Sequence, residues 1–393
     1  MLVALFAYGS FVLLRINAFH GDLSRFVVAS DRLIPTASGA RAGLTVLHGT
    51  SGFDGQFYYM LALNPFSPQP TLPGAHYSLG AYRAQRILYP FLVWLLTLGG
   101  HARYVPLAMI SVNLIAIVVI AALAAMIARR LGREPLAGTM VAFYPGLLLS
   151  LAADLSEPLA LACALGGLLC IMNRKWRSAA LLLTLAVLAR ETTLLFALAL
   201  LALVAVSYLP PYVSFRVPAL RLIRLIPQAD RRGAILAGLA PVLAEVMWQL
   251  FLRVRWGQSA LQSGGHLNLG APLVGAATGP SAWLIQDWPP LLIGMHYLEY
   301  LYLLALVGFV AYSLWSKREF DHVVFAWAGL LLLGASLTAT NWTQDWGFIR
   351  ALAEFAVTSL LLLIPARPSV RLTALATTMC IWGIVFLTHY AAS

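Results

Sequence analysis

The stretch from Tyr104 to Ala128 reads YVPLAMISVNLIAIVVIAALAAMIA and contains no Asp, Glu, Lys or Arg. A helix of about 17–25 apolar residues is long enough to cross the hydrocarbon core of a bilayer. Similar runs recur along the 393 residues, of which 61% are hydrophobic and 10% charged, against about 25% charged in soluble domains. The runs are continuous rather than alternating, which favours helices over a closed barrel. We therefore predict an all-α, polytopic helical membrane protein that forms one integral membrane domain over residues 1–393.

Eleven stretches have the composition of transmembrane helices. They are residues 1–17, 104–128, 135–152, 157–173, 178–190, 193–209, 233–252, 290–315, 321–340, 352–366 and 372–390. We interpret the first as a retained anchor, because no small-residue cleavage site follows Arg15. The apolar run from Ile87 to Leu98 is too short to span and is typical of an interfacial or re-entrant helix.

Basic residues in alternate short connections predict the orientation of the chain. Fifteen of the 26 fall on one side, which the positive-inside rule makes cytoplasmic, together with the N-terminus. They are Arg129, Arg130, Arg133, Arg174, Lys175, Arg177, Arg216, Arg221, Arg224, Arg231, Arg232, Lys317, Arg318, Arg367 and Arg371. The long segments then face the extracytoplasmic side: the first loop, 18–103, which we expect to carry short interfacial helices, the second long loop, 253–289, and 341–351.

Several function classes are excluded or disfavoured by composition. The net charge of +11 arises from these loop residues rather than from one binding face, so we expect no nucleic-acid partner. Cys163, Cys170 and Cys380 lie within apolar runs without metal-ligand spacing and are interpreted as small apolar residues. The sequence contains no P-loop, GxGxxG motif or His/Cys cluster. We therefore expect no metal and no cofactor, although a bound divalent cation remains open.

The segment GFDGQFYYMLALN, residues 52–64, carries the strongest chemical signal. It places the carboxylate of Asp54 beside Gln56, Tyr58 and Tyr59, which are groups of the kind that hold a sugar. Asp54 is either the N-cap of a following helix or a catalytic base, and the two roles are compatible. Long loops such as 18–103 are commonly functional.

Two further clusters lie at the predicted outer boundary. In YRAQRILYPFL, residues 82–92, Arg83 and Arg86 either extend toward lipid headgroups or bind a phosphate. In YPGLLLSLAADLSEPLAL, residues 144–161, Asp154 and Glu157 cap helices or bind sugar hydroxyls or a cation.

The motif LAVLARE, residues 185–191, ends a predicted span with Arg190 and Glu191. Ionisable residues at such depth rarely face lipid. They therefore form ion pairs, or Arg190 holds a lipid phosphate and Glu191 contacts the sugar or the acceptor.

The later outer segments supply the remaining candidates. Arg253, Arg255 and Arg350 are potential phosphate ligands, and Trp342 and Asp345 are potential sugar or acceptor contacts in TNWTQDWGFIRALAEF, residues 340–355. Tryptophan at span ends is also expected simply as part of an aromatic belt. His266 has no partner set that would make it a metal ligand.

Four of these motifs, GFDGQFYYMLALNPF, YRAQRILYPFL, YPGLLLSLAADLSEPLAL and LAVLARE, occur in an order that resembles the polytopic GT-C glycosyltransferases. The resemblance is to the branch that contains the GPI mannosyltransferase adding the second mannose and its bacterial relatives. It covers residues up to about 200. Phe53 and Phe57 stand where that branch has Trp and His.

The resemblance implies a GT-C-like fold and a glycosyltransferase activity. A sugar, mannose or another hexose or pentose, would pass with inversion from a polyprenyl-phosphate donor to a glycan, lipid or protein acceptor. It assigns the base role to Asp54 and supporting roles to Glu157 and Arg190. It places the active site on the extracytoplasmic face of the lipid bilayer, in a bacterial inner or plasma membrane. The alternatives are a transporter or flippase of a lipid-linked envelope substrate, and a non-catalytic scaffold of envelope glycan assembly.

Overall fold

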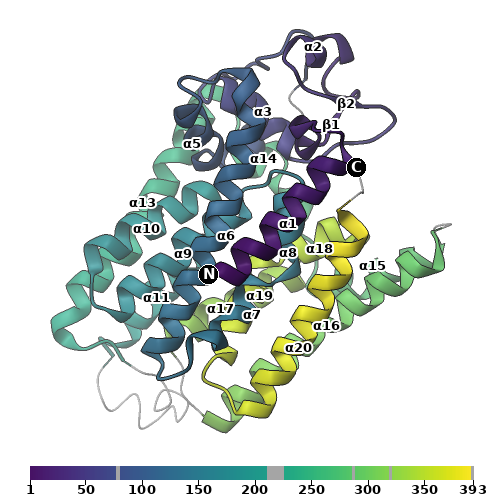
Figure 1. Cartoon of the computed structure of the whole chain (residues 1–393). Helices are drawn as coiled ribbons and strands as arrows, with labels where there is room; N and C mark the ends of the chain where they lie inside the picture. The colour runs from purple at the N-terminus through teal and green to yellow at the C-terminus, as the bar shows by residue number, and fades with distance from the viewer. Residues whose placement is uncertain (77–79, 210–224, 286–287, 318–320, 391–393) are drawn as a thin grey trace.

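The computed structural model describes residues 1–76, 80–209, 225–285, 288–317 and 321–390. These residues form a helical bundle covered at one end by a layer of loops and short helices (Figure 1). The bundle helices are α1 (Leu2–Ala18), α6 (Val105–Arg130), α7 (Thr139–Ala142), α8 (Pro145–Ala152), α9 (Glu157–Met172), α10 (Trp176–Ala189), α11 (Leu194–Val206), α13 (Arg231–Trp256), α16 (Pro290–Lys317), α17 (His322–Ala335), α19 (Ala353–Leu363) and α20 (Pro368–His389).

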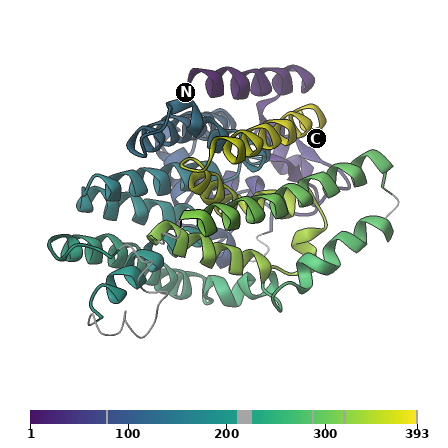
Figure 2. The same ribbon diagram turned by 90° about the horizontal axis from the view of Figure 1, so that it is seen from below.

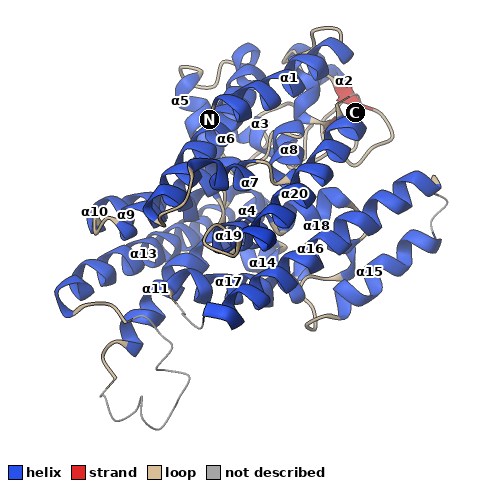
Figure 3. Cartoon of the chain, turned by 60° about the horizontal axis from the view of Figure 1, so that its bottom comes forward, coloured by secondary structure: helices blue, strands red, loops and turns tan. Residues whose placement is uncertain are grey.

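Shorter helices and two strands complete the described structure. They are α2 (Thr36–Arg41), α3 (Gly55–Leu63), α4 (Gly80–Ala84), α5 (Leu88–Leu96), α14 (Ala260–Ser263), α15 (Val274–Ile285), α18 (Asp345–Ala351), β1 (Ala29–Ser30) and β2 (Val46–Leu47). The strands pair in parallel, Ala29 opposite Val46. Figure 3 shows this pair as a small element beside α2 in an otherwise helical chain.

The prediction of an all-α polytopic membrane protein is confirmed. Among the described residues, four helices are long and apolar enough to cross a membrane: Ala102–Arg130, Gln228–Trp256, Pro290–Ser316 and Pro368–His389. The predicted span 135–152 is instead a broken pair, α7 and α8, bent by 48°. The other six predicted spans correspond to apolar helices of 10–17 residues, so the count of eleven crossings stays a prediction.

The predicted short helix at Ile87–Leu98 is observed as α5, which has 9 residues. At about 1.5 Å per residue it is too short to span a bilayer. The first long loop departs from the prediction by containing the β1–β2 pair in addition to its short helices. The basic residues Arg216, Arg221, Arg224 and Arg318 and the side chain of Lys317 lie outside the described part of the chain.

Packing joins consecutive helices and also helices that are far apart in the sequence. α10 lies against α9 and α13, and α11 lies against α13 and α17. Seen from below, α1 lies at one edge beside α20 (Figure 2), where Phe11 packs edge-on against Phe386. A second apolar core, separate from that of the bundle, lies beneath the loop layer and includes Tyr58, Tyr89 and Leu155. It fixes α3 and α5 against the turn between α8 and α9.

Candidate functional site

The side chain of Asp54 lies beneath the loop layer at the start of α3. Asp54 occupies the N-cap position, but its carboxylate accepts no capping hydrogen bond from the helix. The following residue, Gly55, is packed closely against two carbonyl oxygens. A Cβ atom at this position would lie 2.8 Å from the oxygen of Val27 and still nearer that of Ala153. The start of α3 is thereby held against the α8–α9 turn, and the 8% exposed Asp54 is directed toward neighbouring helices rather than its own backbone.

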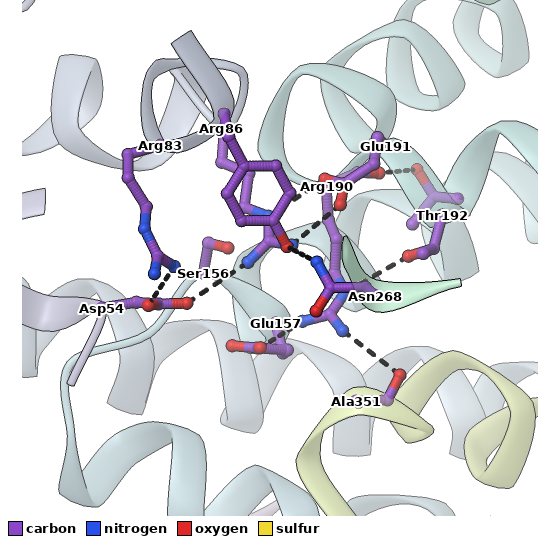
Figure 4. Close-up of polar contacts among 12 residues, drawn as sticks. Asp54, Arg83, Arg86, Ser156, Glu157, Arg190, Glu191, Thr192, Asn268 and Ala351 are labelled. Atoms are coloured by element: carbon purple, nitrogen blue, oxygen red, sulfur yellow. Dashed lines mark hydrogen bonds and ion pairs between the residues drawn. The ribbon is translucent and has the colours of Figure 1, made fainter. Parts of the chain in front are cut away.

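Three guanidinium groups surround the Asp54 carboxylate. Arg83 of α4 donates to Oδ1, Arg350 of α18 donates to Oδ2 at 3.3 Å, and Arg86 lies 3.6 Å from Oδ2. Figure 4 shows the side chains of Arg83 and Arg86 both directed at Asp54. Burial raises the pKa of Asp54, but Arg83, Arg350 and Arg86 outweigh it and hold that pKa well below its usual range.

A second layer of acids holds two of these arginines. Glu191 accepts from Arg86 through both oxygens, at 2.9 Å and 2.8 Å. Glu157 lies 3.6 Å from the Nε atom of Arg350. Arg190 and Glu191 form ion pairs, as one interpretation of the motif predicts, but with other elements rather than with each other: Glu191 with Arg86, and Arg190 with Glu157 and Glu354.

Arg190 forms the deepest part of the network. Its guanidinium donates to Glu157 and to the carbonyl oxygen of Ala351 at 3.2 Å, and its Nε atom lies 2.7 Å from Glu354. The backbone at Arg190 is extended, with φ −161° and ψ 120°, which ends α10 and separates it from the next helical turn. This break lets the consecutive residues Arg190 and Glu191 point in different directions (Figure 4).

The network is electrically balanced. Its four arginines and four acids, if all ionised, carry a formal charge of zero. They are Arg83, Arg86, Arg190 and Arg350, with Asp54, Glu157, Glu191 and Glu354. Buried charges are tolerated when they are paired and hydrogen-bonded, so any anion that enters must compete with an existing pair.

A cavity of about 1420 Å³ opens beside this network. Its polar end is lined by Asp54, Tyr82, Arg83, Arg86, Arg190, Glu191, Asn268, Arg350 and Glu354. Its apolar end is lined by leucines of α11 and α17, including Leu194, Leu198, Leu330 and Leu333. Leu198 is 42% exposed. The cavity wall therefore combines ionisable side chains with leucines of two apolar helices.

Several candidate residues lie around the cavity rather than in its wall. Glu157 is not among the lining residues, and its observed contacts are with Arg190 and Arg350. The hydroxyl of Tyr58 accepts from Arg86 at 3.3 Å. The side chain of Gln56 accepts from the backbone N–H of Ser30 at 3.1 Å. These three residues support the loop layer and its arginines.

Other candidates lie elsewhere in the fold. The Tyr59 hydroxyl donates to the carbonyl oxygen of Ala42 at 3.1 Å. Trp342 is buried in the bundle core and stacks on Phe348. Arg253 and Arg255 are exposed at the end of α13 and do not line the cavity.

Asp154 is also outside the network, and the side chain of Asp345 is not described. Asp154 is completely buried in the α8–α9 turn. Burial raises its pKa well above the usual range, and the neighbouring Arg15 and Asn113 lower it only in part. Asp345 is the first residue of α18, and its side chain lies outside the described part of the structure.

Sequence reasoning did not assign Glu354, Tyr82, Asn268 or Glu245, all of which line the cavity. Glu354 follows Arg350 by four residues, but Arg350 belongs to α18 and Glu354 to α19, so the spacing along one helix does not predict where Glu354 lies. Asn268 donates to the Tyr82 hydroxyl at 3.0 Å, across 186 residues of chain, and no local pattern indicates such a contact.

Fold and site together define an all-α polytopic membrane protein with a buried carboxylate and arginine network at the end of an amphipathic cavity. Among the described residues, no group of three or more His, Cys, Asp or Glu side chains is placed to hold a metal ion.

No protein-family model matches the sequence, and no curated protein matches it. Among solved structures, the chain is similar to the oligosaccharyltransferase of Archaeoglobus fulgidus, crystallised with a tethered acceptor peptide that contains the NVT sequon. The two sequences are 14% identical and the TM-score is 0.39. The match covers 85% of this chain and 51% of the oligosaccharyltransferase chain, so this chain spans about half of its length.

Proposed function

We propose that this protein is a membrane glycosyltransferase that transfers a sugar, with inversion, from a polyprenyl-phosphate donor to an extracytoplasmic acceptor. The observation that carries the proposal is the placement of one carboxylate, Asp54, among three arginines at the polar end of the cavity. Arginine binds phosphate oxygens through a planar set of donors. A carboxylate beside it is suited to accept a proton from a hydroxyl.

In this reaction, Asp54 takes the proton of the acceptor hydroxyl while the hydroxyl oxygen forms a bond to the anomeric carbon. The bond between that carbon and the phosphate oxygen breaks, and polyprenyl phosphate leaves with the bonding electrons. Arg83, Arg86 and Arg350 line the cavity around Asp54 and would stabilise the charge on the leaving phosphate. The leucines of α11 and α17 provide an apolar surface for the isoprenoid tail.

The test is incubation of the purified full-length protein with a panel of polyprenyl-phosphate sugars and candidate acceptors, following release of polyprenyl phosphate and sugar transfer. Asp54→Asn keeps the size of the side chain and removes its basicity, so we expect transfer to fall about 10²–10⁴-fold. Asp31→Asn is the matched control, because Asp31 pairs with the exposed His48 on the loop surface. Full activity of Asp54→Asn, or movement of the substrate without covalent change, would contradict the proposal.

A further inference from the structure

The three arginines around Asp54 differ in what else holds them. Arg86 donates hydrogen bonds to both carboxylate oxygens of Glu191 and to the Tyr58 hydroxyl. Arg350 lies 3.6 Å from Glu157. In the described part of the chain, Arg83 forms an ion pair with Asp54 and with no other acid. If Arg83 moved away from Asp54, one ion pair would break, and every other acid of the network would keep its arginine.

Arg83 also has unused bonding capacity. Its Nε atom, like that of Arg350, is buried without a hydrogen-bond partner, and its guanidinium lies 4.6 Å from the ring centre of Phe57 and 5.2 Å from that of Tyr82. Stacking on rings holds a guanidinium plane while leaving its edge donors available. The side chain is 20% exposed, against 8% for Arg86. Arg83 is thus more accessible than Arg86, the other arginine of the loop layer that contacts Asp54.

With all eight groups ionised the network is neutral, so an entering phosphate competes with acids that are already paired with the arginines. A phosphate that enters the cavity finds each arginine already paired, and Arg83 is the one of the three around Asp54 whose departure separates it from no other acid of the described chain. In Figure 4, Arg83 approaches Asp54 separately from the bonded Arg86 and Glu191.

We propose that Arg83 couples donor binding to activation of the base. The donor phosphate draws Arg83 away from Asp54, while Arg86 and Arg350 remain with Glu191 and Glu157, and Asp54 becomes able to accept the acceptor proton. This inference rests on the proposed function, since the phosphate is that of the donor. Without donor, the carboxylate remains occupied by Arg83 and is a weak base.

Proton uptake on anion binding tests the exchange without any turnover. Loss of Arg83 from Asp54 removes one of the charges that lower the Asp54 pKa, so binding should add protons to Asp54 at pH values above those at which the carboxylate of the free protein titrates. The full-length protein in lipid nanodiscs is titrated calorimetrically with inorganic pyrophosphate in buffers of different ionisation enthalpy. Asp54→Asn has no titratable carboxyl at this position, so its proton uptake measures the contribution of pyrophosphate alone. We expect the proton uptake of the wild type to exceed this value by up to one proton.

Arg83→Gln should bind pyrophosphate about tenfold more weakly and show no uptake beyond that of Asp54→Asn. Arg32→Gln, an exposed arginine of the same loop layer, should behave as the wild type. Equal uptake by the wild type and Asp54→Asn, with both binding pyrophosphate, would overturn the inference. Unchanged binding by Arg83→Gln would overturn it as well.

The pH profile of turnover separates this role from a structural one. The kcat/KM profile reports the free enzyme and the kcat profile reports the complex. Arg83→Gln should therefore move the acid limb of kcat/KM to higher pH and leave the acid limb of kcat in place, because Arg83 has already left Asp54 in the complex. A displacement of both limbs or of neither would contradict the inference.

The two proposals fail in different ways. Absence of sugar release with every donor would remove the proposed function and leave the pyrophosphate result standing. Sugar transfer with no excess proton uptake would remove the Arg83 inference alone.

Discussion

Two buried aspartates show how the surroundings set the behaviour of one side-chain type. Asp54 lies among Arg83, Arg86 and Arg350, which together hold its pKa below the usual range despite burial. Asp154 is buried beside Arg15, and burial raises its pKa more than Arg15 lowers it. An acid with a lowered folded pKa stabilises the fold at higher pH, whereas one with a raised folded pKa loses stability as the pH rises.

This contrast predicts opposite pH dependence for two matched variants. The stabilisation from Asp54 is present above its unfolded pKa, near 3.8, and is lost as the pH falls toward the folded value. Asp54→Asn should therefore lower the melting temperature relative to the wild type by an amount that grows from pH 3 to pH 6. Asp154→Asn should raise the melting temperature relative to the wild type over the same interval. In the wild type the folded chain keeps the Asp154 proton while the unfolded chain releases it, and the substitution removes this difference. Parallel curves for the two variants would contradict these assignments.

Glu157 illustrates a residue that acts through others. It contacts Arg190 and Arg350 but does not line the cavity. Removing one partner of a buried ion pair costs about 3–5 kcal/mol, so we expect Glu157→Gln to lower both the unfolding free energy and the turnover rate. Binding of pyrophosphate at Arg83 should change little, since Glu157 has no contact with that residue. Calorimetry and turnover measured on one preparation check this. Activity lost with stability unchanged would indicate direct contact with the substrate instead.

At the scale of elements, the contact between α3 and the α8–α9 turn positions Asp54. Gly55 is required because a Cβ atom would meet the carbonyl oxygens of Ala153 and Val27. Gly55→Ala should destabilise the protein by about 1–3 kcal/mol, as overpacking generally does, and should reduce turnover by displacing Asp54. Gly9→Ala is the control, because the added atom meets nothing within 4 Å. Thermal unfolding of the two variants measures the difference, and equal stabilities would show that the contact is not tight.

The elements also show which features local sequence can predict. Apolar length placed all eleven predicted spans on helices, because helix formation in lipid depends on the composition of each segment. The break between α7 and α8 was not predicted, although Pro145 begins α8 and proline is favoured in the first turn of a helix. The carboxylate at residue 54 was found because an acid in a predominantly apolar chain is conspicuous. Its partner Arg350 is 296 residues away, and only tertiary packing decides which of six candidate arginines reach it.

For the whole molecule, the basic connections and the loop layer should lie on opposite sides of the membrane. Lys175, in the exposed turn between α9 and α10, belongs to the predicted cytoplasmic set, and Gln69 is exposed in the first long loop. In a variant with Cys163, Cys170 and Cys380 replaced by Ala, a cysteine at position 69 should react with a membrane-impermeant maleimide in intact spheroplasts. A cysteine at position 175 should react only after permeabilisation. The expected orientation follows from the preference of basic loops for the cytoplasmic side. The reverse labelling pattern would place the Asp54 cavity on the cytoplasmic face. A lipid-linked donor would then have to be used before it crossed the bilayer.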